Sequence, residues 1–302
     1  MDGIILIDKP AGPTSADVVR QIKWRVKPAR VGHLGTLDPF ATGVLPILVG
    51  EATKLAPFLQ DGEKHYAGLI ALGTETDTLD RTGEVIRTAP VPPLDRARLE
   101  AIAAAFIGTI TQTPPIFSAI KRGGVPLYKL ARRGEEVAPP APRQVEIARL
   151  ELIAEGAGAI RFTMVCSPGT YVRSLARDIG LALDSAAHLA ELRRVRNGAF
   201  AIESARSLDA VLAALESGGD GLCLIGLRDA VPDLPEAAVD AATAKRLRNG
   251  DSRALDGLVP TCAGWFKVVA DDRLLAVAEA TSRVTAVIAR IFGEGREAAA
   301  PR

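Results

Sequence analysis

The feature that most constrains this chain of 302 residues is a turn-rich segment followed at once by an apolar run. The segment, Gly32–Gly43, reads GHLGTLDPFATG and contains three glycines, one proline and two threonines. Glycine and proline favour tight turns, whereas the next residues, Val44–Val49, read VLPILV and are typical of a buried strand. We therefore expect a tight loop at the edge of a folded core, directly before a buried strand. One carboxylate, Asp38, lies in that loop.

The residues around Asp38 leave its role open. A carboxylate beside a proline in a glycine-rich loop can act as a nucleophile, a general base or a metal ligand. It can equally cap its own turn, which is an ordinary role of aspartate in loops. The loop has no second acid, so a hydrolase with paired carboxylates is not indicated. Asp77 and Asp80 lie in a separate polar loop without a third ligand, and we interpret them as loop acids.

Apolar and amphipathic segments alternate along the first 200 residues. Apolar runs predict strands at 3–8, 65–72, 145–154 and 159–166. Helical spacing and start signals predict helices from Thr14, over 94–106, over 125–134, and from the turn at 167–169 to Leu183. Because strands and helices alternate without regular βαβ spacing, the pattern favours a mixed α/β or α+β sheet domain.

The last part of the chain reads as a separate small module. Possible breaks lie at 217–221 and 232–235, and a basic helix near 241–248 follows them. Short strands are predicted around 265–270, 273–280 and 284–291. We therefore expect a large domain over residues 1–230 and a mostly β module over residues 231–302.

The charge is distributed unevenly, although its formal sum is only +1. No acid occurs between Asp17 and Asp38, where five basic residues lie. Further basic clusters occur at Lys121–Arg122, Lys129–Arg133, Arg193–Arg196 and Lys245–Arg248. Such faces suit a phosphate backbone, and the alternative for any one cluster is an ordinary solvated helix surface.

The cysteines and apolar runs limit the class of protein. Cys166, Cys223 and Cys262 are isolated, which argues against a disulfide framework and against a zinc site. The longest apolar runs are shorter than a membrane span, and Ile4–Ile7 is shorter than the apolar region of a signal peptide. We expect a soluble cytoplasmic protein.

Four other side chains are candidates to act with Asp38. An ionised carboxylate in a partly dry pocket needs a cation, and Arg173 follows a Gly-Thr turn at the start of a predicted helix. Two of the three tyrosines, Tyr66 and Tyr171, lie beside turns, and the ring of His33 can stack on a base. The alternatives are a surface arginine, core or edge tyrosines, and a hydrogen-bonded loop histidine.

Five segments together resemble one family in their order and spacing. They are GIILIDKPAG at 3–12, the loop at 32–43, GEATK at 50–54, PPIFSAIK at 114–121 and GTYVRSL at 169–175. On these segments the chain closely resembles the TruB family of bacterial tRNA pseudouridine synthases, which act on uridine 55 of the tRNA T loop. The resemblance extends to about Arg196, and the tail resembles more loosely the PUA-type RNA-binding module of such enzymes.

This resemblance implies a pseudouridine-synthase fold, with a mixed, largely antiparallel central sheet flanked by helices and a small β-rich PUA-like module. It also implies catalytic roles for three residues. Asp38 matches the catalytic aspartate, and Tyr66 matches a tyrosine that stacks on the target base near C5. Arg173 matches the arginine that pairs with the aspartate.

Further roles follow from the same resemblance. His33 would fill the space left by the flipped nucleotide, and Lys9 with Pro10 would support the catalytic loop. The predicted substrate and RNA contacts also include Tyr171, Leu192, Lys54 and Lys121.

The chain departs from the family pattern at a few positions. Phe117 replaces a tyrosine that is common in its segment, which puts a hydroxyl contact there in doubt. Leu34 and Thr36 vary the loop without touching the aspartate.

The predicted function is isomerisation of uridine to pseudouridine at position 55 of tRNA, by base flipping and an aspartate nucleophile. The resemblance implies no cofactor or metal, and the T stem-loop of tRNA as partner. We infer no obligate protein partner, and we expect a monomer because no apolar surface stripe is evident in the sequence. The alternative is a non-catalytic tRNA-binding protein or tRNA-folding chaperone on the same fold. A small-molecule hydrolase with a carboxylate nucleophile is disfavoured by the distributed basic clusters and the tail.

Overall fold

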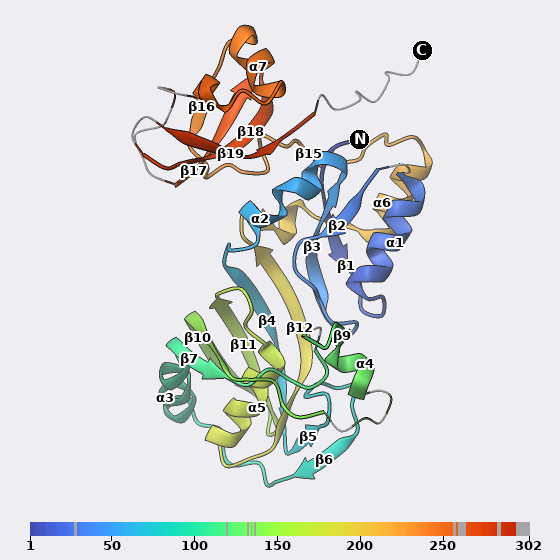
Figure 1. Cartoon of the computed structure of the whole chain (residues 1–302). Helices are drawn as coiled ribbons and strands as arrows, with labels where there is room; N and C mark the ends of the chain where they lie inside the picture. The colour runs from blue at the N-terminus through green and yellow to red at the C-terminus, as the bar shows by residue number, and fades with distance from the viewer. Residues whose placement is uncertain are drawn as a thin grey trace.

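The computed structural model describes residues 1–26, 29–118, 120–131, 133, 135, 137–255, 258, 264–282 and 285–293. Figure 1 shows an elongated molecule, with a large twisted sheet in the body and a small β module at one end. Of the residues singled out in the sequence, Lys27, Ala119, Arg132, Cys262 and Val284 lie outside the described residues.

The body is built on one eleven-stranded sheet, whose main path is β14-β1-β3-β12-β4-β11-β10-β7. Its strands are β1 Gly3–Lys9, β2 Val31–His33, β3 Thr42–Val49, β4 Lys64–Leu72, β7 Gly108–Gln112, β10 Arg143–Glu155, β11 Ala159–Cys166, β12 Ala187–Asn197, β13 Phe200–Ala201, β14 Arg206–Ser207 and β15 Leu224–Ile225. Most neighbours are antiparallel, whereas β1–β14 and β3–β12 are parallel. The predicted α+β class with a largely antiparallel sheet is therefore confirmed.

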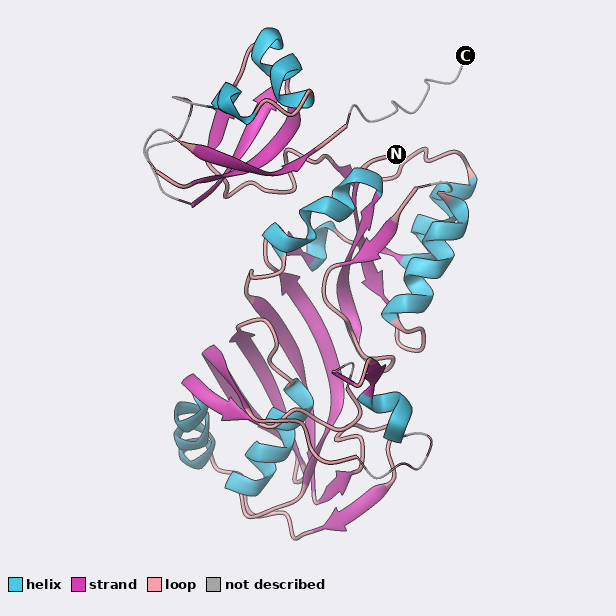
Figure 2. Ribbon diagram, viewed as in Figure 1, coloured by secondary structure: helices cyan, strands magenta, loops and turns pink. Residues whose placement is uncertain are grey.

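Helices and short hairpins flank this sheet (Figure 2). The helices are α1 Ser15–Arg25, α2 Ala56–Leu59, α3 Arg96–Phe106, α4 Leu127–Ala131, α5 Val172–Ala182 and α6 Leu208–Glu216, with 3-10 turns η1 Gly50–Leu55 and η2 Ile202–Ser204. The hairpins pair β5 Thr74–Thr76 with β6 Val85–Thr88, and β8 Lys121–Arg122 with β9 Val125–Pro126. The helix predicted over 125–134 is shorter than expected, because β9 takes its first two residues.

The predicted start of the first helix is confirmed by its cap. The Thr14 hydroxyl accepts a hydrogen bond from the Asp17 amide, and the Asp17 carboxylate accepts one from the Thr14 amide. This reciprocal arrangement satisfies two amides that the helix itself leaves unpaired. Since β1 ends only a few residues earlier, the cap fixes where the chain turns beside the loop that contains Asp38.

The central strand β12 was not predicted as a strand, since its sequence reads as a basic cluster. It lies between β3 and β4 and pairs with β4 along most of its length (Figure 1). Buried positions recur along it, with Leu189, Leu192, Arg194 and Asn197 all below 9% exposure. The helix α5 packs against this strand, so β12 belongs to the core of the domain.

The C-terminal part forms a second, four-stranded sheet in the order β16-β17-β18-β19. Its elements are β16 Glu236–Ala238, α7 Ala241–Arg248, η3 Ser252–Leu255, β17 Gly264–Ala270, β18 Arg273–Ala280 and β19 Ala286–Ile291. The module has an apolar core of its own around Leu247 and Phe266. The predicted division between residues 230 and 231 falls between β15 and β16.

The module also shares a core with the large domain. Leu274, Val277 and Phe292 pack in one buried cluster with Leu6 and Leu48 of the main sheet. Phe58 of α2 meets Trp265 of β17 edge to face, with ring centroids 5.1 Å apart. Apolar contacts of this kind pack the module against the large domain, to which the backbone also joins it.

None of the helices in the described part of the chain is long and apolar enough to cross a lipid bilayer.

Candidate active site

Asp38 lies in the loop that joins β2 to β3. Hydrogen bonds from Gly12 and Ser15, which precede this loop in the sequence, fix its backbone. Ser15 Oγ accepts a hydrogen bond from the Leu37 amide at 2.9 Å and donates one to the Leu37 carbonyl at 3.1 Å. The Gly12 amide donates to the Pro39 carbonyl at 2.8 Å. Asp38 is therefore held between two residues whose backbones are both hydrogen-bonded to neighbouring segments.

Lys9 ties the same loop to the end of β1. Its fully buried ammonium donates to the carbonyls of Pro10 and Pro13 at 2.8 Å each, and to that of Pro39 at 3.2 Å. Burial lowers the pKa of Lys9 to about 8. Its position agrees with the supporting role expected for Lys9, whereas the ring of Pro10 is exposed.

Arg173, from the first turn of α5, meets Asp38 with a two-point ion pair. Arg173 Nε lies 2.8 Å from Asp38 Oδ2, and Nη2 donates to Oδ1 at 3.1 Å. The arginine side chain is only 6% exposed, whereas that of the aspartate is 32% exposed. The pair is thus rigidly held on the arginine side and open on the aspartate side.

The remaining donors of Arg173 are also engaged. Nη1 donates to the Thr78 carbonyl and Nη2 to the Phe117 carbonyl, both at 2.9 Å. Residue 117 contributes a backbone oxygen here, so the side-chain difference from the family pattern does not affect this contact. The guanidinium is fixed by three segments of the chain at once.

Asp80 is a member of this network that sequence reasoning did not assign to the site. Its Oδ2 lies 3.6 Å from Arg173 Nη1, and its side chain is 6% exposed. Its Oδ1 accepts hydrogen bonds from Thr78 and Thr82, so its interpretation as a loop acid is also correct. Nothing in the sequence signals the contact, which arises only when the loop folds over the start of α5.

The electrostatics of Asp38 combine opposing effects. Burial raises its pKa, Arg173 lowers it, and the nearby charge of Asp80 raises it again, with a net shift upward. The carboxyl is therefore more basic than an ordinary aspartate, although an ion pair holds it in place.

Tyr66 lies on β4 beside the centre of β12, with Met164 of β11 and Arg194 of β12 as its neighbours across the sheet. Burial raises the pKa of its hydroxyl, and the positive charge of Arg194 opposes that effect. Leu192, two residues before Arg194, is 7% exposed and pairs with Gly68 of β4. The predicted residues Tyr66 and Leu192 thus share the middle of the sheet.

Tyr171 is placed by a buried glutamine. Gln112 Oε1 accepts a hydrogen bond from the Tyr171 amide at 2.7 Å, and Gln112 Nε2 donates to its carbonyl at 3.0 Å. The Arg143 guanidinium lies over the Tyr171 ring, 4.6 Å from its centroid. These contacts fix the residue that precedes α5 and, through it, the direction of Arg173.

His33 ends β2 at the entrance to the loop. Its Nδ1 is buried without a hydrogen-bond partner in the described part of the chain. Burial and the charge of Arg194 lower its pKa, so the ring is neutral near neutral pH. A neutral ring with an unsatisfied nitrogen is suited to contact a base or to donate to a ligand.

Neither of the two predicted lysines is a hydrogen-bond or ion-pair partner of Asp38, Arg173 or Asp80 in the described part of the chain. Lys54 Nζ is 2.6 Å from Glu51 Oε2 and donates to the Ile291 carbonyl at 3.0 Å, so it bridges to the C-terminal module. Lys121 is exposed on the β8–β9 hairpin. RNA contact stays a prediction for both, and for Lys54 it competes with these internal contacts.

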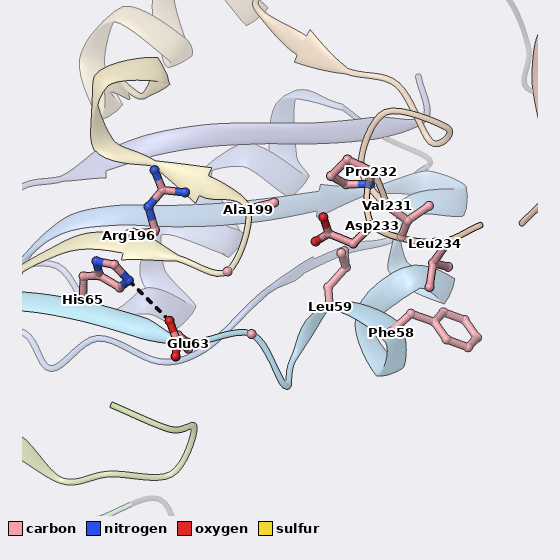
Figure 3. Close-up of a pocket in the computed structure, with 13 residues that line it drawn as sticks. Phe58, Leu59, Glu63, His65, Arg196, Ala199, Val231, Pro232, Asp233 and Leu234 are labelled. Carbon is pink, nitrogen blue, oxygen red and sulfur yellow. Dashed lines mark ion pairs between the residues drawn. The ribbon is translucent and has the colours of Figure 1, made fainter. Parts of the chain in front are cut away.

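Two cavities flank the sheet near these residues. One of about 350 Å³ is lined by Phe40 and Thr42 at the C-terminal end of the Asp38 loop and by residues of β4 and β12, including Leu192; Asp38 itself is not among its lining residues. The other, of about 570 Å³, lies between α2, β12–β13 and residues 230–234 (Figure 3). Its polar wall includes the His65–Glu63 pair, with Nε2 and Oε2 3.8 Å apart, and it is not lined by Asp38.

Within the described residues there is no group of three or more histidine, cysteine, aspartate or glutamate side chains arranged to hold a metal ion. The charged centre of the site is the Asp38–Arg173–Asp80 network. Such a centre offers one carboxylate with a raised pKa and a side chain that is 32% exposed, which suits a nucleophile or a general base.

Comparison with known sequences gives a consistent result. Residues 23–172 match the family described as TruB family pseudouridylate synthase (N terminal domain), and residues 173–225 match the tRNA pseudouridylate synthase B C-terminal domain. The tRNA pseudouridine synthase B of Geotalea uraniireducens is 44% identical over 256 residues, which is 85% of this chain and 82% of that protein. The enzyme of the same name from Geobacter sulfurreducens is 44% identical over 250 residues, 83% of this chain and 82% of the relative.

Solved structures show the same fold. A Cbf5–Nop10–Gar1 complex contains a chain that matches 96% of this chain and 84% of its own length, with 26% identity and a TM-score of 0.73. An H/ACA RNP bound to a substrate RNA containing 2′-deoxyuridine matches 98% of this chain and 86% of its own, with 25% identity and a TM-score of 0.72.

Proposed function

This chain belongs to the TruB family of pseudouridylate synthases, and on this premise we propose that it modifies uridine 55 of the T loop with Asp38 as nucleophile. Membership makes the chain an enzyme that isomerises uridine in tRNA to pseudouridine. The position of the uridine, the reacting side chain and the recognition of the T stem-loop by a monomer are the parts that we propose.

The observation that carries the proposal is the two-point contact of Arg173 with Asp38. A bidentate guanidinium keeps a carboxylate in one orientation and supports its charged form. The aspartate side chain nevertheless stays 32% exposed, so one side of it is open to a substrate. A purely RNA-binding protein has no use for an oriented carboxylate, which would repel the phosphate backbone.

The reaction is an isomerisation whose atoms balance without a co-reactant. The bond between N1 of uracil and C1′ of the ribose breaks, a bond between C5 and C1′ forms, C5 loses a proton and N1 gains one. Attack at C1′, attack at C6 and formation of a glycal all begin at the same carboxylate. Tyr66, whose ring lies on the neighbouring strand, is the proposed base that takes the proton from C5.

The target base has to leave the stack of the T loop before it can reach Asp38. Unstacking costs about a few kcal/mol, and contacts to the flipped base and the backbone offset this cost. We assign the stacking contact to Tyr66 and a wall of the pocket to Leu192. His33 takes the space that the base leaves, and Tyr171 lies at the start of α5 beside the pocket.

The experiment incubates purified protein with an unmodified T stem-loop RNA and maps pseudouridine chemically along the strand. We expect product at position 55 only, no product from the same RNA carrying cytidine there, and no product with Asp38→Ala. Product at another uridine would contradict the assigned position. RNA binding without product from the wild type would favour a chaperone instead.

A further inference from the structure

Arg194 is a buried arginine in the centre of β12 that none of the roles above uses. Its side chain is 1% exposed, and it is among the largest fully buried side chains of the described chain. No carboxylate in the described part of the chain forms an ion pair with it, whereas Arg193 beside it pairs with Asp8 at 2.7 Å. Burying a guanidinium without an acidic partner is costly, so a specific use of its charge is expected.

The side chain of Arg194 fastens the catalytic loop on both sides of Asp38. Its Nη2 donates to the Gly35 carbonyl at 3.0 Å, three residues before the aspartate. Its Nε donates to the Val44 carbonyl at 2.9 Å, six residues after it. The planar fork of one guanidinium therefore spans the loop and sets the distance between its ends.

Two glycines make this close approach feasible. A Cβ added to Gly35, which has φ +80°, would lie 3.2 Å from Arg194 Nη1. One added to Gly43 would lie 2.2 Å from the Arg194 carbonyl oxygen, because β3 and β12 pair there in parallel. The loop glycines thus fit around both the backbone and the side chain of this arginine.

The same guanidinium lies beside the Tyr66 hydroxyl. Arg194 and Tyr66 are direct partners in the register of β12 and β4, so their side chains emerge on the same face of the sheet. The other ionisable groups that act on Tyr66 are Cys166 of β11 and Asp38 of the loop, both of which raise its pKa. The positive charge of Arg194 opposes them and lowers the pKa of this hydroxyl.

We propose that Arg194 is a positioning residue of the reaction, which fixes the Asp38 loop through the Gly35 and Val44 carbonyls and holds and polarises the Tyr66 hydroxyl. A single side chain would then set the geometry between the carboxylate that attacks and the phenol that accepts the proton. This inference rests on the function proposed above, and it adds a residue that touches neither the base nor the ribose.

The test compares Arg194→Met, which removes the charge, with Arg194→Lys, which keeps a charge but loses the fork. The rate is the single-turnover release of tritium from T stem-loop RNA labelled at C5 of its uridines, with enzyme in excess. We expect Arg194→Met to lower this rate by about 100-fold, as loss of one preorganised donor does elsewhere, while RNA affinity changes by less than about twofold. We expect the tritium-release rate of Arg194→Lys to lie between those of Arg194→Met and the wild type.

A second readout follows the ionisation of Tyr66 by absorbance near 295 nm, without RNA. The chain has three tyrosines, and the step that belongs to Tyr66 is identified by its loss in Tyr66→Phe. Because a nearby cation favours the phenolate, its removal in Arg194→Met is expected to move this step upward by about 1 pH unit or more. A residue that only stabilises the fold would leave the step in place.

Val211→Ala is the matched control, since Val211 on α6 is as buried as Arg194, at 1% exposure, and lies outside the site. This variant should lower the free energy of unfolding without changing the tritium-release rate per folded molecule or the pH at which Tyr66 ionises.

Two results would overturn the proposal. One is that the pH at which Tyr66 ionises stays the same in Arg194→Met; the other is that this variant loses rate only because it loses RNA affinity to the same extent. If Arg194→Met does not fold, a wild-type rate for Arg194→Lys overturns it, and a slower rate at unchanged affinity supports it. Failure of the wild type to act on the RNA contradicts the proposed function, whereas the titration is independent of it.

Discussion

Asp38 is oriented by Arg173 and yet remains partly open, and both properties arise from the segments around it. The loop backbone is fixed by Ser15 and Lys9, and the guanidinium is fixed by the carbonyls of Thr78 and Phe117. The aspartate is therefore oriented in advance, which would contribute to the rate if it reacts as proposed.

The rate should depend on pH through Asp38. Its pKa is raised above the ordinary value of 3.8, with burial as the largest cause. Because the proposed mechanism needs the carboxylate form of Asp38, we expect activity above the raised pKa and loss of activity as pH falls through it. Asp80→Asn removes a negative charge that contributes to this shift, so the acid limb of the single-turnover profile should move to lower pH. Asp77→Asn in the same loop should leave the acid limb of the pH profile unchanged. An equal shift of this limb in both variants would contradict the assigned effect of Asp80.

Arg173→Lys should be strongly impaired although it keeps the charge. A lysine ammonium replaces neither the two-point contact with Asp38 nor the bonds to the two carbonyls. We expect the single-turnover rate to fall by about 10²–10³-fold, with RNA affinity in a filter-binding assay within about twofold. Arg177→Lys, on the same helix, is the control, because its guanidinium pairs with Asp178 instead. A loss below about tenfold in Arg173→Lys would show that charge alone suffices.

The sequence predicts Asp38 and Arg173 as site residues, but it does not predict the charged residues that contact this site. Asp38 and Arg173 were predicted as a pair, because a carboxylate in a partly dry pocket needs a cation and because both match a family pattern. Asp80 and Arg194 were not assigned roles, since their contacts depend on segments more than 90 residues apart in the chain.

Among the elements, β12 decides the geometry of the site. It contributes Leu192, Arg194 and Asn197 to the interior, and Asn197 Nδ2 donates to the Leu34 carbonyl of the catalytic loop at 2.7 Å. Three arginines within four residues normally indicate a surface, so the pattern favoured a solvated cluster over a strand. β12 is recognised as a strand only from its pairing with β3 and β4. By contrast, caps and periodicity predicted α1, α3, β4 and β11 to within about two residues.

The close approach of the loop to β12 predicts that Gly43 is indispensable. It has φ +106°, and a Cβ there would meet the Arg194 backbone at 2.2 Å. Gly43→Ala should lower the free energy of unfolding in urea by at least about 1–3 kcal/mol. Gly32→Ala is the control, because nothing lies within 4 Å of its added Cβ and its φ is not positive. Equal stability of the two variants would contradict the described packing.

The whole molecule combines a formal net charge of only +1 with local clusters of basic residues. The β8–β9 hairpin presents Lys121 to solvent, whereas Lys54 is engaged at the junction with the C-terminal module. We expect the hairpin to contact the RNA backbone, and the module, whose core is continuous with the large domain, to extend the RNA-binding surface.

Lys121→Ala should weaken RNA binding in a salt-dependent way. If the ammonium neutralises one phosphate, the slope of log affinity against log salt should fall by about one. Arg96→Ala is the control, because Arg96 is also exposed but pairs with Glu100 on α3. Equal slopes for Lys121→Ala and the wild type would remove Lys121 from the interface.

We propose that the Asp38 carboxylate starts the isomerisation, and Asp38→Asn removes the charge of that carboxylate. Asparagine has nearly the same size but no charge, so RNA binding should persist. The measurement is single-turnover release of tritium from C5 of uridine 55 in a T stem-loop RNA, at saturating enzyme. The account predicts rapid release by the wild type and none by the bound Asp38→Asn variant. Release by that variant within about tenfold of the wild-type rate would contradict it.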